Sequence, residues 1–312
     1  MMSEKETKRV KELVSEFRQD QKKNVFKTAK LKFSGVDGHD VYNITAPFRS
    51  ANRTVIAGRV EPRDHEYSNV VFFEETDGTW APIAGAPVYN LQDPFITYIR
   101  NELVFGGVQI KDVEKGLEWR TVLFRGPDIF NLVECFIGPA GMKDIRLCDL
   151  QNGKIAVFTR PQGEIGGRGK IGYVDIDNLE GLTIAVIESA TLLHGMFHPM
   201  DWGGVNEAHL LTNGEIGVLA HAACYENDHL MQERHYYAKS FIFNPVLKEF
   251  RDYKIIASRD QFEAGPAKRA DLANVIFSSG LIRIDGKATL YAGVSDAESH
   301  WIEIDDPFMV KE

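Results

Sequence analysis

The sequence predicts an all-β fold, a five-bladed β-propeller with an N-terminal amphipathic helix. Short runs rich in β-branched and aromatic residues occur at 154–161, 215–223 and 288–296. Each run follows a dipeptide that suits a type I′ hairpin turn: Asn152-Gly153, Asn213-Gly214 and Asp285-Gly286. Convincing helical periodicity is scarce after residue 31, so the long C-terminal part is expected to consist of hairpins.

The spacing of these turns predicts the number of blades. With a looser copy at Asn101-Glu102, the turns begin at residues 101, 152, 213 and 285, which gives intervals of 51, 61 and 72 residues. Repeated hairpins at such spacing are typical of β-propellers, and the roughly 280 residues after the helix divide into about five units of about 55. A two-sheet sandwich or jelly roll is the alternative fold.

The first thirty residues differ from the rest of the chain. Ser3 and Glu6 have the spacing of a capping box, and apolar residues then recur at helical spacing: Val10, Leu13, Val14 and Phe17. This pattern predicts an amphipathic helix that packs on the main body. Because no Ser/Gly-rich or low-complexity tract interrupts the remainder, we expect a helical extension over residues 1–30 and one catalytic propeller domain over residues 31–312.

Composition limits the classes of partner. The chain has 312 residues, and 45 acidic against 36 basic side chains give a formal net charge of -9 with neutral histidines, which argues against a nucleic-acid-binding surface. The apolar stretches are shorter than the ~20 residues needed to span a bilayer, so no membrane association is expected. The charged N-terminus and the three cysteines, which form no CxxC pair, favour the cytoplasm.

Neither a metal nor a cofactor is expected. His194 and His198 with Asp201, or His221 with Cys224, resemble metal-ligand spacings, but these stretches have the character of loops or strands, and no HExxH motif occurs. The absence of GxGxxG and of a βαβ pattern argues against a dinucleotide-binding domain. A GxSxG motif is also absent, so a serine nucleophile has no support.

Two segments carry the chemistry of a candidate active site. Asp93 precedes a proline, which restricts its backbone and suits a fixed acid or base, although Asp-Pro is also an ordinary turn. Arg160, Arg168 and Lys170 flank a glycine-rich loop whose amides could approach an anion closely. An exposed charged hairpin would explain the same cluster.

Three further segments offer groups that bind sugars. Trp202 could stack on a sugar ring while Asn206 and Glu207 form hydrogen bonds with hydroxyls, although a buried propeller tryptophan is an equally common role. Arg59 with Glu61, and Asp296, stand at the ends of predicted strands. Arg59 and Asp296 occupy matching strand ends, so both could point into one channel.

Taken in order, these segments resemble a known family. The chain is similar, from about Val41 to Asp306, to the five-bladed β-propeller β-mannoside phosphorylases of glycoside hydrolase family 130 (GH130). It is more similar to their relatives, the mannosyltransferase/phosphorylases of kinetoplastids and bacterial homologues, formerly a domain of unknown function. The resemblance rests on these motifs: DVYNITAPF (40–48), AGRVE (57–61), QDPF (92–95), KDIRL, FTRPQG and GGRGKIGY (143–173), WGGVNEAHLL (202–211), RHYY (234–237), and NVIFSSG and LYAGVSDAE (274–298).

The resemblance implies roles for individual residues. It makes Asp93 the single general acid, places Arg59 in the sugar subsite and has Asp296 bind the mannosyl unit. The residues that it places near phosphate are Arg160, Arg168, Lys170, His221 and Tyr237. Where the phosphorylases have Glu-Asp-Pro-Arg, this chain has Gln92-Asp93-Pro94-Phe95, so one arginine contact is missing.

The expected function is therefore that of an inverting β-1,2-mannoside phosphorylase or mannosyltransferase that uses mannose 1-phosphate or a sugar nucleotide. Its expected ligands are a sugar phosphate and a mannoside or oligosaccharide. One carboxylate suffices for such a reaction, because phosphate itself attacks the anomeric carbon, whereas a retaining glycosidase needs two. The alternatives are an inverting hydrolase, with Asp296 or Glu207 as a second carboxylate, and a non-catalytic propeller that binds a glycan. The sequence predicts no oligomeric state.

Overall fold

Antiparallel β-sheets make up most of the structure, a computed structural model that describes residues 7–21, 27–114 and 116–309. The first sheet contains β2 (Asp40–Tyr42), β3 (Phe48–Ser50), β4 (Arg53–Glu61), β5 (Asn69–Thr76) and β6 (Thr79–Pro82). The second contains β7 (Gln92–Ile99), β8 (Glu102–Val113), β9 (Gly116–Gly126) and β10 (Val133–Ile137). The third contains β11 (Arg146–Asp149), β12 (Ile155–Thr159), β13 (Gly172–Ile176) and β14 (Thr191–Leu192). The predicted all-β class is confirmed.

The largest sheet consists of two antiparallel groups. One contains β15 (Trp202–Leu210), β16 (Ile216–Asn227), β17 (Gln232–Asn244) and β18 (Glu249–Ala257). The other contains β19 (Asn274–Ile284), β20 (Lys287–Val294), β21 (Glu298–Asp305) and β1 (Thr28–Lys30). A short parallel pairing between β17 and β19 joins the two groups.

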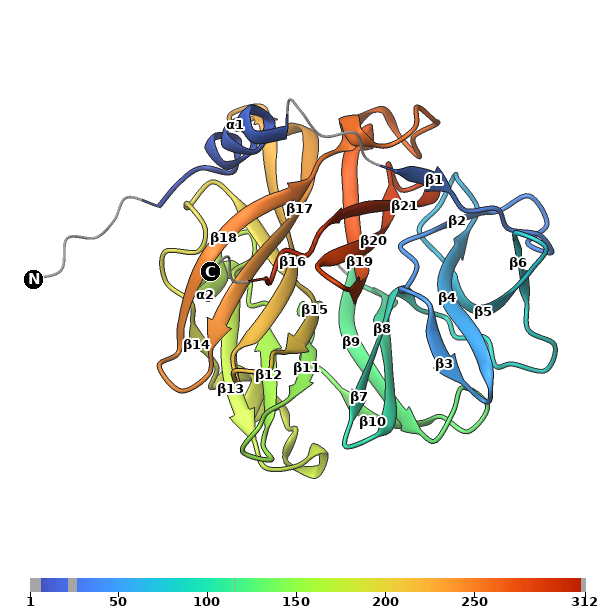
Figure 1. The fold of residues 1–312 in the computed structure, drawn as a ribbon, viewed down its shortest axis with the longest axis horizontal. Helices are drawn as coiled ribbons and strands as arrows, with labels where there is room; N and C mark the ends of the chain where they lie inside the picture. The colour runs from blue at the N-terminus through green and yellow to red at the C-terminus, as the bar shows by residue number, and fades with distance from the viewer. Residues whose placement is uncertain (1–6, 22–26, 115, 310–312) are drawn as a thin grey trace, which may run out of the picture.

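The sheets follow one another in chain order around the molecule, from blue through green and yellow to red in Figure 1. The ring closes where β1, from the start of the chain, pairs with β21 near its end. Residues 28–30 belong to the predicted helical extension, yet they form β1 and are part of the last sheet. The sheet-bearing part therefore begins before the predicted boundary at residue 31.

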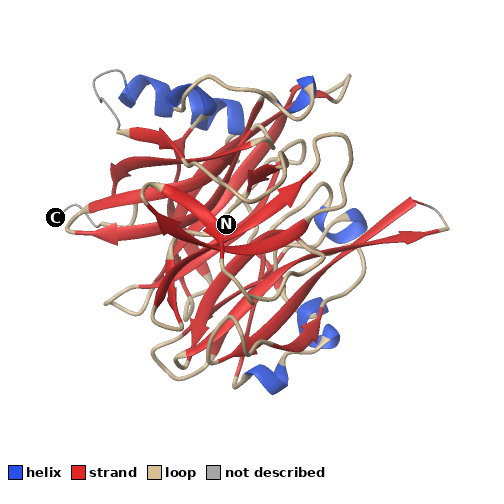
Figure 2. Ribbon diagram, turned by 90° about the vertical axis from the view of Figure 1, so that its right-hand side faces the viewer, coloured by secondary structure: helices blue, strands red, loops and turns tan. Residues whose placement is uncertain are grey.

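Helices lie at the periphery, as Figure 2 shows. The longest, α1 (Val10–Gln21), buries the predicted apolar stripe of Val10, Leu13, Val14 and Phe17 and packs on β16 and β18. The short helical elements are α2 (Gly163–Gly166), α3 (Ile184–Glu188), η1 (Leu179–Gly181), η2 (Arg259–Gln261) and η3 (Ala270–Leu272). Within the described ranges no helix is both long and apolar enough to cross a membrane.

A distant carboxylate caps α1. Asp201 accepts the backbone N–H of Val10 at 2.7 Å and forms an ion pair with Arg9, whose Nη2 also reaches Asp228 at 2.8 Å. This arrangement satisfies a free N–H group at the helix N-terminus. The predicted capping box, Ser3 and Glu6, lies outside the described residues. Asp201 therefore anchors the helix. Among the described residues, no group of three or more potential metal ligands occurs at His194 and His198 or elsewhere.

The predicted hairpins form, but their turn types differ. Asp285 and Gly286 both have positive φ, 48° and 77°, as a two-residue type I′ turn requires. At Asn152-Gly153 and Asn213-Gly214 only the glycine has a positive φ, and the loop is three residues long. A type I turn closed by a left-handed glycine has this pattern, so the type I′ prediction is wrong at these two sites. The turn predicted at Asn101-Glu102 is a two-residue turn at Arg100-Asn101, one residue earlier.

Candidate active site

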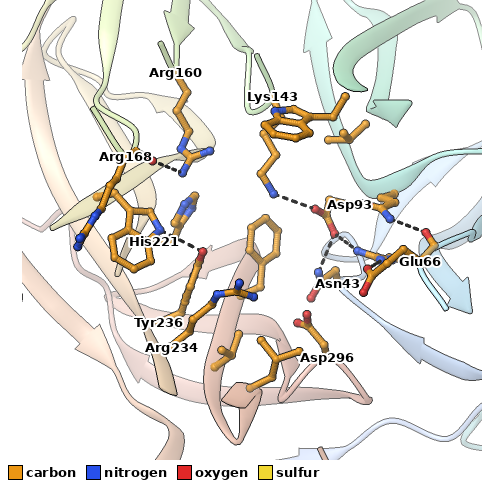
Figure 3. Close-up of a pocket in the computed structure, with 18 of the residues that line it drawn as sticks. Asn43, Glu66, Asp93, Lys143, Arg160, Arg168, His221, Arg234, Tyr236 and Asp296 are labelled. Atoms are coloured by element: carbon orange, nitrogen blue, oxygen red, sulfur yellow. Dashed lines mark hydrogen bonds and ion pairs between the residues drawn. The ribbon is translucent and has the colours of Figure 1, made fainter. Parts of the chain in front are cut away.

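A cavity of about 660 Å³ is bounded by residues of the first, second and largest sheets and by residues that lie just outside the strands of the third, such as Lys143 and Arg160. Figure 3 shows charged residues on opposite sides of this cavity. Asp93 and Asp296 lie on one side, and Arg160 and Arg168 lie on the other. Lys143 reaches from between them toward Asp93, at 3.7 Å. The cavity can therefore hold an anion next to a group that gives or takes a proton.

Asp93 is a buried carboxylate in a strained part of β7. Its φ of 48° is unusual for a residue other than glycine, and the register with β8 shifts at this point, so the strand bulges and turns the carboxylate into the cavity. The amide of Asn43 donates to it at 2.7 Å, and Arg59 donates at 3.1 Å. Burial opposes ionisation, but the charges of Arg59 and Lys143 outweigh it and hold the pKa of Asp93 below its usual value.

Arg59 and Glu61 occupy alternate positions on β4, but they have different places in the site. Arg59 lines the cavity, and its Nε donates to Glu61 at 2.9 Å. Glu61 is 1% exposed, lies outside the cavity lining and also binds Tyr42 and Lys268. Glu61, predicted to bind substrate, therefore holds Arg59 in position from behind.

Asp296 faces the cavity in Figure 3, and no hydrogen bond from the described residues reaches its carboxylate. Burial raises the pKa of Asp296 to about 6; the charge of Arg59 opposes this rise, and that of Asp93 adds to it. The protein thus moves the pKa values of Asp93 and Asp296, two carboxyl groups of one cavity, in opposite directions. Such a separation is typical of sites that divide acid and base roles.

The cationic side of the cavity is held by backbone carbonyls. Arg160 donates through Nε to the carbonyl of Gly203 at 2.8 Å, and Arg168 donates to that of Met200 at 2.7 Å. The Arg160 guanidinium packs against Gly169, whose φ of 135° and close contact leave no room for a side chain. Lys170, the third predicted phosphate ligand, lies outside the cavity lining.

Trp202 and His221 line the cavity between the two arginines and β17. Trp202 donates from Nε1 to the hydroxyl of Tyr236 at 3.0 Å, and the rings of His221 and Tyr236 are stacked with centroids 5.6 Å apart. Asn206 lies behind His221 and contacts its Nδ1 at 2.7 Å, so the structure places this predicted sugar ligand outside the cavity wall.

Two other predicted residues point away from the cavity. Tyr237 follows Tyr236 on β17, so its side chain faces the opposite side of the sheet, where its hydroxyl lies 3.1 Å from Nδ1 of His235. Glu207 accepts the N–H of Leu281 at 2.7 Å and contacts His209 at 3.0 Å. Neither lines the cavity.

Sequence reasoning did not select Asn43, Lys143 or Tyr236, all of which line the cavity. Each lies within a motif that supported the resemblance, namely DVYNITAPF, KDIRL and RHYY. Asn43 has a positive φ of 46° directly after β2, and Lys143 lies just before β11. Their place within these motifs was the only signal that could have identified them.

Comparisons with known proteins identify the family to which the chain belongs. Residues 17–310 match a family model described as a protein of unknown function, DUF1861. The mannose phosphorylase MPT-4 of Leishmania mexicana, solved with a phosphate ion, is 36% identical with a TM-score of 0.88, and the match covers 96% of this chain and 93% of that one. The GDP-Man-dependent mannosyltransferase MPT-1 of the same organism is 34% identical with a TM-score of 0.87 over 96% and 94% of the two chains.

A more distant likeness concerns the fold alone. The β-1,2-mannobiose phosphorylase of Listeria innocua, solved with β-1,2-mannobiose, is 13% identical with a TM-score of 0.60, covering 89% of this chain and 90% of that one. No curated protein matches the sequence.

Proposed function

The chain belongs to the DUF1861 family and is an enzyme of the glycoside phosphorylase type, and from this premise we propose that it makes or phosphorolyses β-1,2-linked mannosides. Mannose 1-phosphate is the product of breakdown and the donor for synthesis. The observation that carries the proposal is the position of Asp93, buried in the cavity with Lys143 beside it and two arginines on the facing side.

In the proposed reaction, phosphate binds on the side of Arg160 and Arg168 and attacks the anomeric carbon. Asp93 gives a proton to the departing glycosidic oxygen, directly or through a sugar hydroxyl. In synthesis the same carboxylate takes the proton of the acceptor hydroxyl. The low pKa of Asp93 keeps it ionised in the free enzyme, as a base in synthesis must be. A bound phosphate dianion offsets the charge of Lys143 and thereby raises that pKa for breakdown.

The remaining residues divide between two subsites. Arg59 and Asp296 bind the mannosyl unit, because both line the cavity next to Asp93. Trp202 and Tyr236 close the wall on the phosphate side. Lys170, Glu207 and Tyr237 have no direct role in this scheme, since none of them lines the cavity.

Five antiparallel groups, the last closed by β1, correspond to five blades around the cavity. We propose that the blades form one catalytic domain that starts at β1, with α1 as a docked N-terminal extension.

Incubation with mannose 1-phosphate and mannose tests the proposed function. We expect release of phosphate, and we expect Asp93→Asn to abolish it without unfolding the protein, because asparagine tolerates the positive φ at this position. Failure to turn over any hexose phosphate or mannoside would contradict the proposal and favour a non-catalytic glycan-binding propeller.

An inverting hydrolase is the second candidate, because Asp296 supplies another carboxylate in the same cavity. Such an enzyme would use that group to activate water. Phosphate dependence separates the two reactions. Phosphorolysis stops in phosphate-free buffer, whereas hydrolysis of a β-mannoside continues at the same rate.

A further inference from the structure

The hydrogen-bonding state of His221 is fixed by its neighbours. Nδ2 of Asn206 donates to the carbonyl of Ser278, so the side-chain oxygen of Asn206 must be the atom that faces His221. That oxygen lies 2.7 Å from Nδ1 of His221 and can only accept. Nδ1 therefore carries the hydrogen, and in a neutral ring Nε2 is then an acceptor with a free lone pair.

The ring is neutral because of its surroundings. His221 is 1% exposed, and burial together with the charges of Arg160, Lys143 and Arg146 lowers its pKa to about 3, against the opposing charge of Asp144. No described residue forms a hydrogen bond with Nε2, although His221 lines the cavity. The lone pair is thus available to a ligand.

His221 and Arg160 lie side by side. A Cβ atom built on Gly204 would come within 2.6 Å of the Arg160 side chain and within 3.0 Å of His221. Gly204 thus provides the space in which a cation and an uncharged acceptor meet. Arg160 attracts an oxyanion, but the Nε2 lone pair repels any oxygen of that anion that lacks a hydrogen.

We propose that His221 accepts a hydrogen bond from the P–OH group of phosphate and thereby selects phosphate over sulfate. This inference rests on the proposed function, because it assigns the specificity of the same anion subsite. Hydrogen phosphate has one hydrogen to donate and keeps its charged oxygens for the arginines and the anomeric carbon. Sulfate has the same size and shape but no hydrogen at neutral pH, so it leaves Nε2 facing a charged oxygen.

Binding of phosphate, arsenate and sulfate by calorimetry tests the proposal. At mildly alkaline pH phosphate and sulfate are both dianions, so net charge does not separate them. We expect arsenate, which also carries a hydroxyl, to bind like phosphate and sulfate to bind ~10- to 100-fold more weakly, the range of one hydrogen bond to a charged group. The glutamine amide in His221→Gln can offer either N–H or C=O, so this variant should bind sulfate only ~3-fold or less more weakly than phosphate.

The control is His39→Gln, because His39 is exposed and lies outside the cavity; it should keep the selectivity of the wild type. Binding of phosphate and sulfate with equal affinity to the wild type would overturn the inference and leave the proposed phosphorylase intact. Failure of phosphate and arsenate to bind at all would overturn both this inference and the proposed phosphorylase function.

A measurement on the wild type does not depend on the variant folding. Nitrogen NMR of the labelled imidazole should show hydrogen on Nδ1 and none on Nε2 throughout the neutral range, with the Nε2 signal moving when phosphate is added. Hydrogen on Nε2 in the free enzyme would refute the proposal.

Discussion

The Nη1 atom of Arg59 lies 3.1 Å from Oδ1 of Asp93, while Nε of the same guanidinium donates to Glu61. Glu61 in turn binds Lys268, so the arginine is held between a carboxylate in the cavity and another behind the wall. This chain of charges positions the carboxylate of Asp93, the proposed acid/base group, and keeps it ionised. Lys143 is the second cation near Asp93.

Lys143→Met should move the acid limb of the synthesis pH profile to higher pH. In the proposed reaction Asp93 is the base for synthesis and must be ionised, so synthesis is lost as pH falls through its pKa. Lys143, 3.7 Å away, lowers that pKa, and its removal raises it. We expect a shift of about one pH unit in kcat/KM, the low end for a neighbouring charge. The exposed Lys111→Met variant is the control, and an unchanged profile in Lys143→Met would count against Asp93 as the base.

Asp296→Asn should stabilise the protein at neutral pH while it reduces activity. The pKa of Asp296 is raised from 3.8 to about 6, so its unfavourable charge in the folded state appears as pH rises through that value. The protonated carboxyl group of Asp296 makes its full contribution to stability below pH 3.8, its pKa in the unfolded chain, and this contribution is lost as pH rises through about 6, its pKa in the folded protein. Removal of the charge should therefore increase the free energy of unfolding by about 1–2 kcal/mol above pH ~7.

Urea denaturation at neutral and at acidic pH measures this effect. We expect Asp296→Asn to leave the free energy of unfolding unchanged at a pH below the pKa of this group in the unfolded chain, because the carboxyl group is then protonated in both states. The exposed Asp305→Asn variant should show no gain at either pH. If Asp296→Asn destabilises the protein at neutral pH, the carboxylate has a favourable partner and the pKa argument is wrong.

The adjacent tyrosines of β17 offer a matched pair. Tyr236→Phe removes the hydroxyl that accepts from Trp202 and leaves that indole N–H unpaired at the cavity wall. We expect KM for the anionic substrate to rise ~3- to 10-fold, as the loss of one hydrogen bond implies. Tyr237→Phe alters only the contact with His235 on the other face, so its KM should stay near that of the wild type. A larger rise in KM for Tyr237→Phe than for Tyr236→Phe would mean that Tyr237, and not Tyr236, faces the cavity.

Those two tyrosines show what the sequence alone can and cannot predict. Turn signals and β-rich runs predicted the all-β class, and the residues quoted from separate motifs, such as Asp93, Arg59 and Asp296, do meet in one cavity. The face that each strand turns inward was harder to predict. Tyr236 and Tyr237 are chemically alike, and bulges in the neighbouring strands shift the alternation of faces.

Long-range contacts explain the remaining differences. Glu61 pairs behind the cavity wall with Lys268, which lies 207 residues later in the chain. No local sequence pattern signals that pairing. Asn43 and Lys143 lie beside strands, in loops without periodicity, so nothing in their spacing marked them. The three-residue loops at Asn152-Gly153 and Asn213-Gly214 contain the same dipeptide as a type I′ turn, and only the strand pairing distinguishes the two.

Gly169→Ala should weaken phosphate binding through Arg160. A Cβ at residue 169 would lie 2.6 Å from Nη2 of Arg160 and 2.8 Å from its Nε, so the guanidinium must leave the carbonyl of Gly203 that orients it. We expect KM for phosphate to rise ~10-fold or more, because the Arg160 guanidinium would be displaced from the proposed anion subsite.

Gly167→Ala provides the control for backbone strain in the same loop. Gly167 also has a positive φ, 59°, but a Cβ there meets nothing within 4 Å. Alanine at this position should cost about 1 kcal/mol of stability and leave the KM for phosphate unchanged. Phosphate titration of initial rates, with thermal melting of both variants, separates the two effects. An equal rise in KM for both alanine variants would show that loop strain, and not the position of Arg160, controls phosphate binding.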